Sequence, residues 1–361
     1  MKPIKRLLFI VNAPKFFLSH RLPIALAAKS AGYEVHVATA DDGQACRAIT
    51  DQGLFHHAVP LSRSGQHPVR ELAAIMSLRR LMKRLQPDLV HLVTIKPVLY
   101  GGLAARLAGV PAVVAAVSGL GTVFVSRGGR AGLVRRVVSV LYRLALGHRN
   151  LAVIFQNPDD RAALMRIGAV EAHQTRLIRG SGVALEDCPL VPEPEGCPVV
   201  TMAARLLREK GVVEFVEAAR LLAKRGIEVR FRLIGSPDPG NPTTITPEEL
   251  ATWRDEGLVE LPGYRNDITA QYAQSHIVCL PSYYGEGLPK SLVEAAACGR
   301  AVVTTDMPGC RDAIEPGKSG VLVPARDAVA LADAIQRLVE DGEQRRAMGR
   351  AGRELAEREF A

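Results

Sequence analysis

Apolar residues along this chain follow two periods that alternate from one end to the other. Short runs rich in Val, Leu, Ile and Ala predict buried strands, and segments with apolar positions about every 3.6 residues predict helices. In the first half the predicted strands are Leu7–Val11, Glu34–Thr39, Leu89–Val93, Ala112–Val117 and Ala152–Phe155, and the predicted helices include Leu22–Ala31, Glu71–Leu85 and Val98–Ala108. Repeated strand–helix units of this kind predict a parallel sheet with helices on both faces.

The alternation breaks once, over residues 181–198. This segment holds four prolines and four acidic residues and follows neither period, so we predict a linker there. The second half resumes with strands at Val199–Ala203, Val229–Ile234, Ile277–Leu280, Ala301–Thr304 and Val321–Val323, and with helices at Val212–Arg225, at Pro289–Cys298 and from Ala328 onward. We therefore predict an α/β protein of two Rossmann-like doubly wound domains, residues 1–180 and 199–361, with a ligand cleft between the carboxyl ends of their sheets.

Composition excludes several classes of protein. With 48% apolar and 23% charged residues, the chain is typical of soluble globular proteins rather than disordered or fibrous ones. The six cysteines form no C-x-x-C pair, which argues against a zinc site and favours buried thiols in a reducing cytosol. Leu7–Val11 is too short for a signal-peptide core. The uncharged stretch Leu107–Ser126 contains Pro111 and several glycines, so we interpret it as a helix end, a strand and a loop rather than a membrane span.

The two halves differ in charge. Residues 1–180 carry 25 basic and 9 acidic side chains, whereas residues 181–361 carry 21 and 28, which predicts different partners for the two domains. No acidic residue lies between Asp88 and Asp159, and arginines alternate there with apolar residues at Arg127, Arg130, Arg135, Arg136, Arg143 and Arg149. This pattern predicts a basic amphipathic helix on an anionic membrane surface, although a core-facing helix with a solvated basic face remains open. No nucleic-acid motif accompanies the arginines, so we expect no nucleic-acid partner.

The strongest local motif, Tyr284–Gly299, contains two carboxylates. Glu286 lies in a glycine-flanked loop after a predicted strand, and Glu294 lies on the helix that this loop opens. The spacing allows both to line one cavity at a helix N-terminus, where the backbone N–H groups of Gly287 and Leu288 favour an anionic or polyhydroxyl ligand. Two solvated glutamates are the alternative interpretation.

The E-x7-E spacing, within EGLPKSLVEAAACG, resembles the donor-binding signature of glycosyltransferase family 4, which comprises retaining enzymes of GT-B fold. Ala204–Gly211 likewise resembles the family's diphosphate-binding segment. The resemblance implies a catalytic set of Arg205 and Lys210, on the diphosphate, and Glu286, on the sugar. It implies further donor contacts at Gly235, Arg265, Asp267, Ile268, Gly287, Leu288, Pro289, Lys290 and Glu294. Ala184 stands where the family commonly has Asp.

Transfer of a sugar from a nucleoside diphosphate requires neutralising the charge that builds on the leaving diphosphate. Arg205 and Lys210 can do this electrostatically. Because the chain has no D-x-D metal motif, we expect no metal and no cofactor. The family resemblance implies that the acceptor hydroxyl attacks on the face that the leaving group vacates, so we expect neither glutamate to act as a nucleophile.

The loop Asn12–Pro23 lacks the glycine pair of many family members and resembles the subgroup of capsule and lipid-linked oligosaccharide transferases. That resemblance implies a polyprenyl-diphosphate-linked saccharide as acceptor. It places acceptor contacts at Lys15, His20, Arg21, Lys96, Ser118 and Gly119. A capping or surface role for His20 is equally open, and the sequence identifies no general base.

We therefore expect a retaining, metal-independent glycosyltransferase that takes a hexose or N-acetylhexosamine from a UDP-sugar. We expect it on the cytoplasmic face of a bacterial inner membrane, as a peripheral protein. The alternatives are a transferase with a soluble acceptor, a UDP-sugar epimerase, and a non-enzymatic protein that binds nucleotide sugars or nucleic acid. Because such enzymes usually end with a helix that returns to the first domain, we expect the native C-terminus to extend past Ala361.

Overall fold

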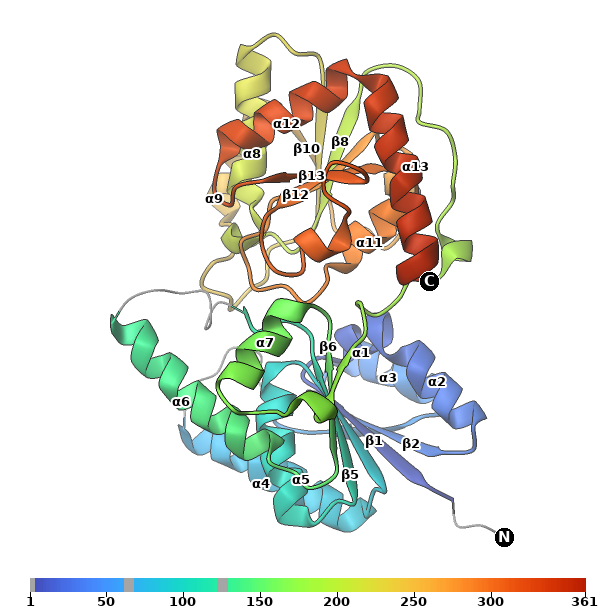
Figure 1. The fold of residues 1–361 in the computed structure, drawn as a ribbon, viewed down its shortest axis with the longest axis vertical. Coiled ribbons are helices and arrows are strands. Elements are labelled where there is room, and N and C mark those ends of the chain that lie inside the picture. Colours follow the sequence, from blue (N-terminus) through green and yellow to red (C-terminus); the bar gives the residue numbers. More distant parts are fainter. Residues whose placement is uncertain (1–3, 62–67, 122–128) are drawn as a thin grey trace. The chain divides into compact units, whose positions relative to one another are not determined.

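The computed structural model describes residues 4–61, 68–121 and 129–361, and the chain divides between Ile178 and Arg179 into two compact units (Figure 1). Each unit is built on an all-parallel sheet whose strands are linked by helices. Both units are therefore Rossmann-like α/β domains, as the alternation of periods predicts. Within the described ranges, no helix combines the length and the apolar character needed to cross a bilayer.

The first unit has a seven-stranded sheet of order β3-β2-β1-β4-β5-β6-β7. Its strands are β1 (Arg6–Val11), β2 (Glu34–Thr39), β3 (Phe55–Ala58), β4 (Leu89–Val93), β5 (Ala112–Val117), β6 (Leu151–Phe155) and β7 (Thr175–Leu177). Its helices are α1 (Pro14–His20), α2 (Leu22–Ser30), α3 (Gly43–Asp51), α4 (Pro68–Leu85), α5 (Gly102–Ala108), α6 (Gly129–Leu146) and α7 (Pro158–Arg166). All five predicted strands are present. The edge strands β3 and β7 escaped prediction because they are short and partly exposed.

The predicted helix Val98–Ala108 is in fact two elements. A π-helical turn, Pro97–Gly101, precedes α5, and its first residue follows β4 closely. A Cβ atom on Gly102 would lie 2.5 Å from the carbonyl oxygen of Ala145 in α6, so only glycine allows this approach of the two segments. The turn is therefore shaped by packing between α4, α5 and α6, which a local helical period does not reveal.

The second unit has a six-stranded sheet of order β10-β9-β8-β11-β12-β13. Its strands are β8 (Val199–Ala203), β9 (Arg230–Ile234), β10 (Val259–Gly263), β11 (Ile277–Leu280), β12 (Ala301–Thr305) and β13 (Gly320–Val323). Its helices are α8 (Val212–Lys224), α9 (Pro247–Glu256), α10 (Ile268–Ala273), α11 (Lys290–Ala297), α12 (Ala328–Glu340) and α13 (Gly342–Glu359). Pro289 is the N-cap of α11 rather than its first residue, with ψ of 118°. In Figure 1, α8 lies beside α12, and α11 beside α13.

Residues 181–198, which we predicted to be a linker, pack onto the second unit. Cys188 is buried in its core, and the Arg300 guanidinium donates to the carbonyl of Val191 at 3.0 Å. Further along, Arg345 forms a paired contact with the Glu193 carboxylate at 3.0 and 2.8 Å. These side chains satisfy polar groups of a segment that, apart from the 3₁₀ turn Leu185–Asp187, is extended and irregular. The segment is therefore part of this unit, and its prolines reflect an extended path rather than a free connection.

Candidate functional site

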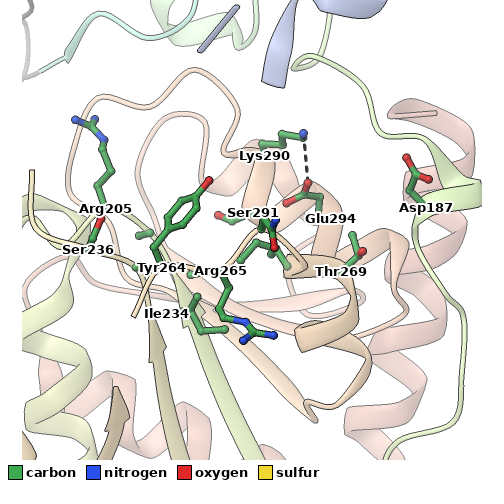
Figure 2. Close-up of a pocket in the computed structure, with 15 residues that line it drawn as sticks. Asp187, Arg205, Ile234, Ser236, Tyr264, Arg265, Thr269, Lys290, Ser291 and Glu294 are labelled. Carbon is green, nitrogen blue, oxygen red and sulfur yellow. Dashed lines mark ion pairs between the residues drawn. The ribbon is translucent and has the colours of Figure 1, made fainter. Parts of the chain in front are cut away.

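A pocket of about 680 Å³ lies at the carboxyl edge of the second sheet (Figure 2). Its walls come from the loops that follow β8, β9 and β10 and from the first turns of α10 and α11. The lining residues are Asp187, Ala203, Ala204, Arg205, Ile234, Gly235, Ser236, Tyr264, Arg265, Asn266, Ile268, Thr269, Lys290, Ser291 and Glu294. The carboxyl ends of parallel strands are the usual place for a ligand in such sheets.

Gly235 permits the close approach of the loops after β8 and β9. Its φ is +150°, and a Cβ atom there would lie 1.9 Å from the carbonyl oxygen of Ala204. Its N–H donates to the carbonyl of Gly263 at 3.0 Å, which joins it to the end of β10 as well. Gly235, predicted as a donor contact, thus shapes the pocket through its backbone.

Arg205 lies on the pocket wall directly after β8 and is half exposed. Its Nη1 is 2.6 Å from Oδ2 of Asp238, which belongs to the loop after β9. The N–H of Asp238 donates to the Thr244 hydroxyl at 2.9 Å, which fixes that loop. An anionic ligand at Arg205 must therefore compete with, or join, a carboxylate already bound to the guanidinium.

The loop after β10 places an aromatic ring and an ion pair beside the pocket. Tyr264 is 76% exposed, and Figure 2 shows its ring extending between Arg205 and Ser291. Arg265 binds Asp267 through two bonds of 2.8 and 2.6 Å, and this contact lowers the pKa of Asp267 to about 2. Asp267 is the N-cap of α10, where Ile268 begins the helix. Of the predicted contacts here, Arg265 and Ile268 line the pocket, while Asp267 holds Arg265.

Lys290 and Glu294 face each other across one turn of α11. Their Nζ and Oε1 atoms are 3.4 Å apart, and both side chains line the pocket (Figure 2). Burial raises the pKa of Glu294, and the lysine opposes that shift by stabilising the carboxylate. The pair offers two acceptor oxygens beside a cation, a suitable arrangement for binding neighbouring hydroxyl groups.

Lys210 and Glu286 are bound to each other. Lys210 Nζ donates to Oε1 of Glu286, and the Ser282 hydroxyl lies 2.9 Å from the same oxygen. Glu286 is buried, and the ammonium also lies 5.2 Å above the ring of Tyr284. Among the residues lining the pocket, Glu294 is present and Glu286 is not. This pocket is therefore lined by one of the two carboxylates that we expected to share a cavity, and their joint role in a donor site stays a prediction.

The segments that carry Lys210 and Glu286 are joined through the backbone. The carbonyl of Glu209 accepts from the N–H groups of Tyr283 and Tyr284 at 2.9 and 3.1 Å. These bonds hold the loop after β11 against the 3₁₀ turn Arg208–Lys210, although 70 or more residues separate them in sequence. The structure thus brings together two motifs that are far apart in the sequence.

Residues 287–289 form the buried turn into α11. Gly287, Leu288 and Pro289 are all buried, and the Pro289 carbonyl accepts from Leu292 N–H at 3.1 Å. They lie next to the pocket in sequence, but its lining begins at Lys290. Their predicted role as donor contacts stays a prediction.

In the described part of the chain, no group of three or more His, Cys, Asp or Glu side chains is arranged to bind a metal ion. Arg205, Arg265 and Lys290, which line the pocket, each bind a carboxylate. Metal independence itself stays a prediction.

The predicted acceptor residues follow three adjacent strands of the first unit, β1, β4 and β5. Lys15 is exposed, 3.7 Å from Asp42. His20 stacks on Phe16 with 4.1 Å between ring centroids, and its Nδ1 lies 2.6 Å from the Ser19 hydroxyl. These contacts at the end of α1 favour the structural interpretation of His20 that we left open.

Arg21 and Lys96 are less exposed than acceptor ligands at a surface usually are. Arg21 is buried between α1 and α2, and burial lowers its pKa to about 10. Lys96 Nζ lies 2.8 Å from Oε1 of Glu71, and both side chains are mostly buried. Burial and a hydrogen bond to Glu71 raise the pKa of the neighbouring Tyr100 to about 12. The Lys96 charge is thus compensated within the unit.

Ser118 and Gly119 follow β5. The Ser118 hydroxyl is buried and has no hydrogen-bond partner among the described residues, and Gly119 has φ of +100°. Buried hydroxyl groups without a hydrogen-bond partner are rare in folded proteins, so this one needs an explanation.

Sequence reasoning missed several pocket residues, including Asp187, Ser236, Asn266, Thr269 and Ser291, and it missed Asp238, which binds Arg205. Most of them follow strands directly or begin the next helix. The rule that ligands bind beyond the carboxyl ends of parallel strands would have suggested Ser236 once β9 was predicted. Asp187 carries no such signal, because it lies in the segment that we interpreted as a linker.

The chain is similar over most of its length to known glycosyl transferases. The family model "Glycosyl transferases group 1" matches residues 190–355, and "Glycosyl transferase 4-like" matches residues 6–157. The chain is 32% identical to the N,N'-diacetylbacillosaminyl-diphospho-undecaprenol alpha-1,3-N-acetylgalactosaminyltransferase of Campylobacter jejuni, covering 93% of this chain and 90% of that protein. It is 25% identical to the UDP-Gal:alpha-D-GlcNAc-diphosphoundecaprenol alpha-1,3-galactosyltransferase of Escherichia coli, covering 76% and 72%.

Among solved structures, Anabaena HepE in complex with UDP-glucose superposes with a TM-score of 0.76 at 20% identity, covering 98% of this chain and 95% of that one. This likeness concerns the fold. Together with the two parallel sheets, it confirms the predicted GT-B fold class.

Proposed function

This chain belongs to the group 1 glycosyl transferases, and we propose that it moves a sugar from a UDP-sugar to a polyprenyl-diphosphate-linked saccharide in glycan assembly. The observation that carries the proposal is the pocket on the second unit, which has the Arg205 guanidinium on one wall and the mostly buried Glu294 carboxylate on another. The names of the two relatives, both of which act on diphospho-undecaprenol-linked sugars, support the acceptor. The transferred group is a hexose or an N-acetylhexosamine.

The pocket suits the parts of a nucleotide sugar. The exposed ring of Tyr264 offers a flat surface for the base, as aromatic side chains do in many nucleotide sites. Glu294 offers two oxygens to the ribose hydroxyls, and Lys290 favours its charged form. Arg205 provides a fork of N–H donors for the diphosphate once the ligand competes with Asp238.

Bond cleavage leaves negative charge on the diphosphate, and the proposed role of Arg205 and Lys210 is to stabilise it. Removing one such donor typically costs on the order of 3 kcal/mol of transition-state stabilisation. The proposed reaction needs no metal, because the two cations act on the same oxygens that a divalent ion would bind. Metal independence is the part of the proposal that chelation tests directly.

We assign retention to attack from the leaving-group side. The bond from the anomeric carbon to the diphosphate oxygen breaks, the acceptor oxygen bonds to that carbon, and the acceptor proton passes to the diphosphate. Glu286 accepts hydrogen bonds from Lys210 and Ser282, so one of its carboxylate oxygens is already engaged by two donors within the protein. Its pairing therefore supports a role in binding the sugar rather than in forming a covalent intermediate.

A lipid-linked acceptor must be met at a membrane surface, and we propose peripheral attachment at the cytoplasmic face through the first unit. In α6, Arg135, Arg136 and Arg143 are exposed together with Val137 and Leu144, which are 53% and 48% exposed. Tyr142 and Ala145 of the same helix are buried. The helix thus packs on the core by one face and shows arginines and apolar residues on the other. Arg127 and the side chain of Arg130 lie outside the described residues.

The test combines the purified full chain, a lipid-linked saccharide acceptor and a panel of UDP-hexoses and UDP-N-acetylhexosamines. We expect one donor to yield lipid-linked product with the anomeric configuration of the donor, at the same rate with EDTA. Arg205→Ala and Glu286→Ala should lose at least 100-fold in rate. Arg208→Ala is the matched control, because Arg208 pairs with Glu249 outside the pocket.

Three results would contradict parts of the proposal. Conversion of the UDP-sugar without an acceptor would indicate an epimerase. Efficient transfer to a soluble saccharide alone would remove the lipid acceptor. Loss of activity with EDTA, restored by a divalent cation, would show that the reaction needs a metal.

A further inference from the structure

The turn after β4 contains a strained residue. Thr94 has φ of +75°, in the left-handed region that β-branched residues rarely adopt. The other non-glycine residues with positive φ in the described ranges are Gln86 and Arg326, and neither is β-branched. Glycine would adopt this conformation without strain. Threonine at this position therefore costs backbone strain that glycine would avoid, and what it offers in return is its side chain.

The Thr94 side chain forms a hydrogen bond at the carboxyl end of the central strands of the sheet. Its hydroxyl donates to Oδ1 of Asn12 at 2.5 Å, which joins the loops after β4 and β1. These two strands are neighbours at the point where the strand order reverses, the usual ligand position in a doubly wound sheet. The Thr94 carbonyl accepts from Val98 N–H at 3.0 Å, and the chain enters the π-helical turn Pro97–Gly101. Positive φ and π-helical turns both concentrate at functional sites.

The polar groups of this turn are neutral. Asn12 and Thr94 carry a carboxamide and a hydroxyl, and Ser118, after the adjacent strand β5, adds a buried hydroxyl with no partner among the described residues. The nearby cation, Lys96, pairs with Glu71 at 2.8 Å. Neutral groups that both donate and accept match the hydroxyl groups of a saccharide better than they match a diphosphate.

We propose that Asn12 and Thr94 form a hydroxyl-binding site for the saccharide part of the acceptor, an inference that rests on the proposed function. Because the Thr94 hydroxyl donates its hydrogen to Asn12, its oxygen is left to accept a hydrogen bond from a sugar hydroxyl. The Asn12 carboxamide N–H groups donate to a sugar oxygen. The strain at Thr94 holds this pair in place before the saccharide binds.

The experiment measures the KM for acceptor and for UDP-sugar separately, with the melting temperature, on the purified full chain. Thr94→Val removes the hydroxyl at constant shape and should raise the acceptor KM about tenfold, the loss of one to two hydrogen bonds. Thr94→Ser should keep the wild-type value. Thr94→Gly should raise the acceptor KM as Thr94→Val does, while melting no lower than wild type because the strain is relieved. In each variant the UDP-sugar KM should stay unchanged.

Gln86→Gly is the matched control. Gln86 has φ of +49° in the exposed turn before β4, at the other end of the strand. Its replacement should also relieve strain, but it should leave both KM values unchanged.

An unchanged acceptor KM in Thr94→Val and Thr94→Gly, with an active wild type, would overturn this inference and leave the proposed function standing. A rise in both KM values would show a general structural role and would overturn it too. A wild-type protein that transfers no sugar to any lipid-linked saccharide would instead refute the proposed function, on which this site depends.

Discussion

Each cation that we assigned to the donor site from the sequence has a carboxylate partner within the second unit. Arg205 binds Asp238, Lys210 binds Glu286, Arg265 binds Asp267, and Lys290 binds Glu294. The sequence could identify the cations and three of the carboxylates, Glu286, Glu294 and Asp267, because they lie in stretches that resemble the family's motifs. It could not identify Asp238, because that pairing depends on how the loop after β9 folds back. Which charges meet is thus a tertiary property, even where the residues themselves are predictable.

Tyr264 allows a test of the proposed base position at the scale of one side chain. Tyr264→Ala should weaken UDP binding about tenfold or more, because stacking of a base on an aromatic ring contributes roughly 1–3 kcal/mol. Since the side chain is 76% exposed, its loss should leave the melting temperature nearly unchanged. Isothermal titration of UDP measures the effect. Tyr264→Phe keeps the ring and is the control; equal binding by all three proteins would place the base elsewhere.

At the scale of elements, burial decided which strands could be predicted. β1 is buried from Leu7 to Val11 and reads as a continuous apolar run, which is typical of a parallel strand covered on both faces. β10 has the sequence VELPG, whose proline and glycine are loop signals, and it lies at the sheet edge. We therefore predicted no strand at this place. The π-helical turn before α5 has no sequence period of its own and could not be predicted.

The close packing of the loops after β8, β9 and β10 can be tested by substituting Gly235. Gly235→Ala should destabilise the second unit by more than about 2 kcal/mol and abolish UDP binding, because the new Cβ meets the Ala204 carbonyl at 1.9 Å. Trp253, the single tryptophan, is buried on α9, so urea unfolding followed by its fluorescence reports on this unit.

Gly240→Ala is the control for that experiment. Gly240 also has positive φ, +87°, but a Cβ atom there meets nothing within 4 Å. It should cost only about 1 kcal/mol of backbone strain and leave UDP binding intact. Equal destabilisation by both substitutions would show that the steric contact at Gly235 is unimportant.

At the scale of the whole molecule, acid should destabilise the first unit through a buried histidine. Burial lowers the pKa of His91, on β4, to about 3, and the nearby Arg21 charge acts in the same direction. Because an unfolded chain protonates this histidine near pH 6.5, acid favours unfolding. This contribution to stability is complete above pH 6.5 and is lost as the pH falls toward 3. Between pH 7 and pH 5 it amounts to about 2 kcal/mol.

His91→Phe isolates this effect, since it removes the titrating group and keeps a ring beside Phe9, 5.1 Å away. Hydrogen exchange of amides in β1 and β4 should show less protection at pH 5 than at pH 7 in wild type, after correction for intrinsic rates. The variant should show a smaller difference. An identical pH dependence in both proteins would mean that His91 is accessible to protons in the folded state.

The uneven charge of the two halves predicts which one meets a membrane. With 25 basic and 9 acidic residues in the first 180 positions, attraction to anionic lipid should come from that half, at about 1 kcal/mol for each basic residue near the surface. The double substitution Arg135→Glu and Arg136→Glu on α6 should therefore lower binding to phosphatidylglycerol vesicles at least about tenfold in a sedimentation assay. Raising the salt from 0.1 M to about 0.5 M should weaken wild-type binding through screening.

The matched control, Arg346→Glu with Arg350→Glu on α13, changes the net charge equally but lies in the second unit. Equal losses in both double variants would mean that net charge alone drives binding, and the basic surface of α6 would then have no specific role.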